Sequence, residues 1–388
     1  MTRFRILLWA GFLPAIVVPI LFFSLWDGFY LMREGAYLLS LLVRARPVER
    51  VKFHADLDER SAALFDSTAS IRAFAEETLG LAADRNFTRY VSINRDYIVT
   101  VVSAAGRLSF QRYYWEYPLF GRAPYRGFFS EAHALREAER LRDEGWDVFV
   151  RRVHAFSLLG YAGDPLYSFM GNYTTYRLAS LIFHEKTHST IWLRNQVQFN
   201  EELATFVEHQ AALLYLQQRY GADSAEYRTA IAAYHDRARF RAVVRSLRDE
   251  LEQLYRSDMP PTEMFEAKTS HIEQFRCDFV LNYDNRFATQ TYRNFAQAPI
   301  NNALLDLYTT YSGEIGLLYE LFDAAGSDLP ATIALLHRVR ARPDDPRAYI
   351  REVLIPELLL SVEGPDGERV LDVAPLNGLD AGINGSHG

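Results

Sequence analysis

The sequence predicts a mainly helical α+β protein with a small β-sheet ahead of the helices that carry its candidate site. Apolar residues recur at helical spacing over residues 29–46, 56–80 and 210–285. Residues 97–103 and 148–156 are instead rich in β-branched and aromatic side chains, which is typical of strands. With 388 residues and 49% hydrophobic content, the chain can bury a large core in one or two domains.

The N-terminal segment has the composition of a membrane anchor. Residues 6–26 carry no charge, and about 20 apolar residues suffice to cross a bilayer as a helix. Arg3 and Arg5 precede this segment, which favours a cytoplasmic N-terminus and places the rest of the chain in a periplasmic or other extracytoplasmic space. We expect an uncleaved anchor over residues 1–28; the opposite orientation and a cleaved signal peptide stay open.

The candidate site begins with the motif H-E-x-x-H at residues 184–188. Residues four apart lie on one face of a helix, so His184 and His188 can offer imidazole nitrogens to a single metal ion, with Glu185 beside them. We expect a second helix to start near Asn200, a natural N-cap, and to supply Glu201 as a third ligand.

Catalytic zinc commonly takes three protein ligands and keeps one position open. The sequence therefore predicts a zinc hydrolase centre, with a satisfied polar core as the alternative because the motif also arises by chance. Zinc lowers the pKa of bound water from about 16 toward 7, and Glu185 is the expected general base and then general acid. Glu208 is either a partner that fixes the tautomer of a ligand histidine or a surface carboxylate.

Two blocks carry a resemblance to a known family: Leu-Ile-Phe-His-Glu-x-x-His over residues 181–188 and Phe-Asn-Glu-x-x-Ala-Thr-x-Val-Glu over residues 199–208. Further matching pieces lie at residues 125–129, 159–166 and 299–303. In these blocks, and from the N-terminal hydrophobic segment to about residue 345, the chain resembles a bacterial family of zinc-dependent aminopeptidases of the HExxH, gluzincin-like type.

The resemblance implies a zincin-like metallopeptidase domain, which we expect over residues 29–360. It also implies that His184, His188 and Glu201 bind Zn²⁺ and that Glu185 is the catalytic carboxylate. The chain departs from the family pattern at residues 186–187, Lys-Thr, where small or apolar residues are usual. This departure leaves the ligands intact but puts a cation next to Glu185 in sequence.

Analogy with other zinc peptidases suggests further parts of the site. Residues 153–160 would form a sheet edge that pairs with an extended peptide substrate, and His154 there is a substrate contact or, more simply, an ordinary strand residue. Tyr311 is the candidate electrophilic helper. A tyrosine at position 161, 167 or 173 could donate to a developing oxyanion.

Substrate specificity is left open by the residues. An aminopeptidase needs an anionic group for the free α-amine, and Glu202 or Glu116 could serve. An endopeptidase of the cell envelope with the same zinc centre would have the same motifs. A non-catalytic scaffold that keeps the fold is the third reading, disfavoured because all four residues of the motif and its third ligand are intact.

The remaining features bound the partners rather than the chemistry. A net charge of −7 disfavours nucleic acid, and Cys277 is expected to be a small buried residue. Charged residues between positions 237 and 255 indicate a solvated helix face rather than a binding patch. Residues 361–388 have the composition of a disordered tail. Protein partners are not indicated.

Overall fold

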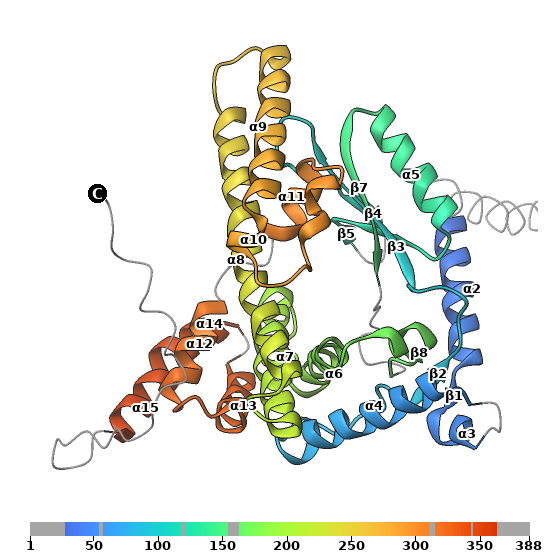
Figure 1. The fold of residues 1–388 in the computed structure, drawn as a ribbon, viewed down its shortest axis with the longest axis vertical. Coiled ribbons are helices and arrows are strands. Elements are labelled where there is room, and N and C mark those ends of the chain that lie inside the picture. Colours follow the sequence, from blue (N-terminus) through green and yellow to red (C-terminus); the bar gives the residue numbers. More distant parts are fainter. Residues whose placement is uncertain are drawn as a thin grey trace, which may run out of the picture.

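The computed structural model describes residues 28–53, 57–117, 121–153, 163–309, 315–342 and 344–362 (Figure 1). The uncharged segment of the expected anchor, residues 6–26, lies outside these ranges, as does the expected tail at residues 361–388 except for its first two residues, which end helix α15 (Ile355–Val362). Across the ranges described, no helix combines the length and apolar character needed to span a bilayer.

Helices make up most of the described chain, as the sequence predicts. The longer ones are α2 (Gly28–Arg44), α4 (Glu59–Glu77), α5 (Glu131–Asp143), α6 (Thr175–Thr190), α7 (Val197–Tyr220), α8 (Ala225–Tyr255) and α9 (Pro261–Leu281). The shorter ones are α3 (Val48–Lys52), α10 (Tyr283–Arg286), α11 (Asn302–Thr309), α12 (Ile315–Ala324), α13 (Leu329–Arg338), α14 (Pro346–Tyr349) and α15 (Ile355–Val362). Short 3₁₀ or π segments are η1 (Ser168–Asn172), η2 (Arg293–Gln297), η3 (Val339–Ala341) and η4 (Ile350–Leu354).

The strands form three small sheets instead of the single sheet expected. They are β1 (Arg46–Pro47), β2 (Arg89–Val91), β3 (Val99–Gly106), β4 (Trp115–Tyr117), β5 (Gly121–Ala123), β6 (Arg126–Phe128), β7 (Trp146–Val153) and β8 (Leu166–Tyr167). β3 is central in the order β6-β3-β7 and pairs antiparallel with both neighbours. β1-β2-β8 is a second sheet and β4-β5 a hairpin.

The β6-β3-β7 sheet is covered on both faces, which explains why nearly every residue of β3 is buried. Helix α5 packs on one face through Ala134, Ala138 and Leu141, and α11 packs on the other (Figure 1). Both predicted strands are confirmed within the described residues. Among the described strands β7 pairs with β3 alone, so it is an edge strand of this sheet as described. Its predicted continuation, with His154, lies outside the described residues.

The Asn301–Asn302 pair is structural. The Asn301 side chain accepts a hydrogen bond from the Leu304 amide at the start of α11. The buried Asn302 amide donates to backbone carbonyls of the β3 turn, including that of Gly106 at 2.8 Å, and accepts from the Tyr255 hydroxyl. These bonds tie α8, α11 and the sheet together, so this part of the family-like pattern serves the fold.

Helices α6 and α7 form the middle of the largest core cluster, with α4 packed against α6 (Figure 1). α8 then runs along α7 and continues beyond it to pair with α9. Pro260-Pro261 separates α8 from α9 as predicted, with a proline at the first helical position of α9, where no backbone donor is lost.

Candidate active site

Helix α6 presents the two histidines because its other face is apolar. The Thr174 hydroxyl accepts a hydrogen bond from the Arg177 amide and so caps the first turn. Leu178, Ile182 and Phe183 are fully buried in the core. His184 and His188, one turn apart, keep 19% and 15% of their side-chain surface accessible, so they face the site.

Helix α7 starts three residues earlier than predicted, at Val197, and Asn200 is not its N-cap. The buried Asn200 amide instead forms two hydrogen bonds with the backbone of Leu193, at 3.0 and 2.8 Å. These bonds close the loop that joins α6 to α7. Asn200 therefore positions the next residue, Glu201, against α6 by fixing the loop geometry.

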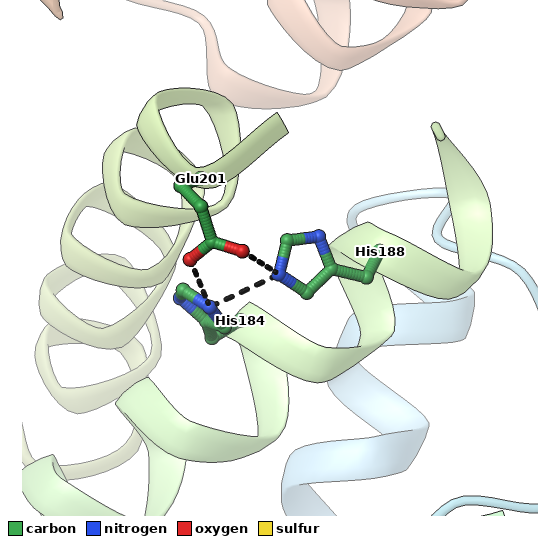
Figure 2. Close-up of side chains that lie close together, drawn as sticks. All are labelled: His184, His188 and Glu201. Carbon is green, nitrogen blue, oxygen red and sulfur yellow. Dashed lines mark hydrogen bonds and ion pairs between the residues drawn. The ribbon is translucent and has the colours of Figure 1, made fainter. Parts of the chain in front are cut away.

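The structure brings His184, His188 and Glu201 together, with one ligand atom of each within 4.8 Å of the others. The two Nε2 atoms lie 3.1 Å apart. The Glu201 carboxylate spans both rings, with one oxygen 3.7 Å from His184 Nε2 and the other 3.4 Å from His188 Nε2 (Figure 2).

This donor set suits zinc. With bonds of about 2.0–2.2 Å, ligand atoms around a tetrahedral zinc ion lie about 3.3–3.6 Å apart. The two Nε2 atoms, 3.1 Å apart, lie near that value, and Glu201 has one oxygen 3.7 Å from His184 Nε2 and its other oxygen 3.4 Å from His188 Nε2. Two imidazole nitrogens and one carboxylate are also a donor combination that zinc prefers in catalytic sites. The residues present therefore fit the ion.

Glu208 fixes the orientation of His184. Its Oε2 lies 2.7 Å from His184 Nδ1, so a neutral His184 donates its Nδ1 hydrogen there and turns the Nε2 lone pair toward Glu201. The other oxygen of Glu208 accepts from Arg237 at 3.2 Å. No such partner holds His188: its buried Nδ1 has no hydrogen bond within the described residues, and its ring contacts Trp192 edge-on at 5.3 Å.

The electrostatics of this cluster favour a bound cation. Burial alone would lower the pKa of His184, but its hydrogen bonds to Glu201 and Glu208 prevail and raise that pKa to about 10. Burial would raise the pKa of both carboxyls, yet the hydrogen bond to His184 acts in the opposite direction, and the pKa of each is lowered to about 2. At neutral pH two carboxylates thus lie beside a His184 imidazole that carries either a proton or a metal ion.

Glu185 is buried, with 8% of its surface exposed, and its charge is among those that raise the pKa of His184. The neighbouring Lys186 does not share this environment. Its fully buried ammonium donates to Glu76 at 2.8 Å and to the Ala82 carbonyl at 2.9 Å, which joins α6 to the end of α4. The departure from the family pattern is therefore a packing feature on the opposite side of α6.

Other predicted residues are not placed at the site. Glu202 is 2% exposed and accepts from Arg347 at 2.5 Å, which links α7 to α14. Glu116 is exposed on β4 and paired with Arg122 at 3.4 Å. Tyr167 is buried in the core, and Cys277 is exposed rather than buried as expected.

Two of the tyrosines proposed as electrophilic helpers or oxyanion donors, at positions 161 and 311, lie outside the described residues. Of the remaining candidate, Tyr173, the hydroxyl has a pKa raised by burial to about 12, and the Arg177 guanidinium lies over its ring. The oxyanion donor therefore stays unassigned.

One face of α8 also differs from the prediction made from its charge pattern. The arginines at positions 237, 241 and 245 do not lie on a plain solvated face but line a cavity beside the candidate metal centre. Their i, i+4, i+8 spacing was visible in the sequence as a stripe on one side of a helix. What the spacing could not show is that α7 and α12 face this stripe.

One comparison with known proteins identifies a family. A family model described as "Putative aminopeptidase" matches residues 29–350, which is most of the chain. No curated protein and no solved structure matches significantly.

Proposed function

We propose, from the premise that the chain belongs to this "Putative aminopeptidase" family, that it is a zinc-dependent peptidase, most simply an aminopeptidase. Family membership supports peptidase activity on a peptide substrate. The observation that carries the zinc dependence is the convergence of His184, His188 and Glu201, with His184 held from behind by Glu208.

In this proposal each described residue has a defined task. His184, His188 and Glu201 hold the ion. Glu208 accepts the Nδ1 hydrogen of His184 and so keeps this histidine in the tautomer whose Nε2 lone pair can bind the ion. Zinc would supply a Lewis acid that lowers the pKa of water and polarises the scissile carbonyl. Burial makes the charge of these groups more effective than it would be in bulk water.

Glu185 is the proton carrier of the reaction. Its carboxylate accepts a proton from the attacking water as the new C–O bond forms at the carbonyl carbon. It then donates that proton to the amide nitrogen as the C–N bond breaks, so the products are a free carboxylic acid and an amine. Its position three residues before His188 places it on the adjoining part of the helix face.

The second candidate is an endopeptidase with the same centre. One observation favours it: Glu202 is buried against Arg347, and Glu116 is exposed and paired with Arg122, so neither proposed anchor for a free α-amine is available. Acetylating the N-terminus of a cleaved peptide separates the two readings, because an aminopeptidase then stops and an endopeptidase continues.

The proposal also includes membrane anchoring by the N-terminal segment. The uncharged residues 6–26 would anchor the protein in a membrane, with the peptidase domain on the extracytoplasmic side. Protease protection of the full-length protein in sealed spheroplasts tests this orientation.

The deciding experiment is the zinc content of the purified full-length protein beside its Glu201→Ala variant. We expect one zinc per chain in the wild type and a large loss in the variant. Glu226→Ala is a matched control, since Glu226 is an exposed acidic residue in the first turn of α8. Carefully purified wild type without zinc would overturn the proposal and favour the scaffold reading.

A further inference from the structure

A cavity of about 610 Å³ lies between α7, α8 and α12. Its described lining includes Thr205 and His209 of α7, Arg237, Arg241 and Arg245 of α8, and Tyr319 of α12. Thr205 lies one helical turn beyond Glu201 on α7, and Arg237 contacts Glu208. The cavity therefore adjoins the candidate metal centre.

The described lining is strongly cationic. Arg237, Arg241 and Arg245 succeed each other at one-turn intervals on the same face of α8. Asp249 is the one carboxylate among the described lining residues, and it pairs with Arg248 at 3.4 Å. The lining histidine, His209, has its pKa lowered to about 4 by burial, so it is neutral at pH 7 and leaves the guanidinium groups as the main charges.

Two of these guanidinium groups have no ion-pair partner among the described residues. Arg237 is held by Glu208 at 3.2 Å. Arg241 is half-buried and Arg245 exposed, and the described part of the chain gives neither an ion pair nor a hydrogen bond. Burial and then the charge of Arg237 lower the pKa of Arg241, so the protein holds this cation in an unfavourable place. An anion in the cavity would relieve that cost.

We propose that this cavity binds a carboxylate of the peptide substrate, with Arg241 as the main contact and Arg245 as the second. The proposal rests on the proposed peptidase function and names its substrate class: short peptides that present a carboxylate to the cavity. Guanidinium groups suit this task because they stay charged and bind carboxylates through two parallel hydrogen bonds.

The spacing along the helices agrees with a short peptide. Four residues of α8 rise about 6 Å, so Arg241 lies about one turn and Arg245 about two turns from the Arg237–Glu208 contact at the metal centre. An extended peptide residue spans about 3.3–3.6 Å. A scissile bond at the centre and a carboxylate at Arg241 or Arg245 are thus a few residues apart. The hydroxyls of Tyr234 and Tyr319, 2.9 Å apart, also line the cavity.

The test is peptide binding to the zinc-loaded, full-length Glu185→Gln protein, in which the contacts are kept and turnover is slow. The probes are trialanine, trialanine amide and Ala-Ala-Glu amide, measured by calorimetry. We expect trialanine to bind about 10- to 100-fold more tightly than its amide, because the amide lacks the carboxylate and so loses the charge-assisted hydrogen bond to Arg241. If an acidic side chain is the natural source of the carboxylate, Ala-Ala-Glu amide recovers the tight binding instead.

Adding Arg241→Gln should abolish the preference for a carboxylate, whereas Arg228→Gln, an exposed arginine near the start of the same helix, should leave it intact. Equal binding of all three peptides, or a preference that survives Arg241→Gln, overturns the proposal while peptidase function stands. Tight, Arg241-dependent binding without any cleavage by wild type would support the subsite and refute the proposed function. No binding of any peptide would overturn both.

Discussion

The metal centre and the arginine-lined cavity adjoin each other but have opposite electrostatics. In the centre, Glu201 and Glu208 surround His184 and raise its pKa to about 10. In the cavity, Arg241 and Arg245 lack an anion among the described residues. The first region would suit a cation and the second an anion, which is the arrangement that the two proposals need to place a charged substrate beside a metal ion.

Glu208 separates the two regions. One oxygen holds His184 and the other holds Arg237, so the same carboxylate belongs to both electrostatic environments. A single hydrogen-bonded carboxylate can therefore orient a candidate metal ligand, His184, and at the same time compensate the charge of the nearest arginine, Arg237.

Glu185→Gln is expected to have the largest effect. It removes the proposed proton carrier while leaving the candidate ligands and the arginines in place, so kcat should fall about 10²- to 10⁴-fold. Zinc content and peptide binding should stay close to wild type. Steady-state kinetics beside metal analysis checks both parts. A kcat within threefold of wild type would exclude Glu185 as the proton carrier.

Glu208→Leu breaks the contact between the regions. His184 loses the acceptor that fixes its tautomer, so zinc affinity should fall about 10- to 100-fold. Glu208→Gln should cost less, because an amide oxygen still accepts the Nδ1 hydrogen. Competition with a chromophoric chelator measures both constants. Unchanged affinity in Glu208→Leu would show that Glu208 does not act on the ligand.

On the cavity side, His209 should make the free energy of unfolding depend on pH. Its pKa is lowered by burial to about 4, so its folded form stays neutral while the unfolded chain, with a pKa near 6.5, takes up a proton. Its contribution to stability is complete above pH 6.5 and is lost as the pH falls from 6.5 to 4, by up to about 3 kcal/mol. Denaturant unfolding of wild type and His209→Gln measures this. Equal pH dependence in both proteins would show that His209 is not its source. His271→Gln is the control, since His271 is a partly exposed histidine on α9.

Arg256→Gln should have the smallest effect and sharpens the contrast with Arg241. Arg256 is largely exposed at the end of α8 and pairs with Glu252 at 3.0 Å. Exposed ion pairs contribute little, so the free energy of unfolding should change by less than about 0.5 kcal/mol, with no change in peptide binding. Urea unfolding checks the first point. A larger loss would show that arginines on this helix act mainly through the fold.

Features set by short segments could be predicted from the sequence, whereas features that depend on distant residues could not. The mainly helical fold, strands β3 and β7 and the break at Pro260 follow from patterns within short segments. The helix start at Asn200 was wrong, because the side chain bonds to Leu193 in the loop rather than to its own helix end. The division into anchor, peptidase domain and tail stays a prediction.

Within the candidate site, the residues next to the motif show the limit of local reasoning. Lys186 follows Glu185 in sequence, but it is buried against Glu76, 110 positions away. Glu202 follows Glu201, but it is buried against Arg347, 145 positions away. Neither partner could be chosen from the sequence, since many acidic and basic residues were available.

By itself, the sequence determined that the two imidazoles could face one ion, because the four-residue spacing is a property of one helix and needs no other part of the chain. The Glu201 carboxylate reaches them because α7 packs against α6. Only the tertiary structure decided which charges around them are compensated. Burial and pairing depend on which helices pack together, so the stripe of arginines on α8 is a solvated face in sequence and a cavity wall in the folded protein.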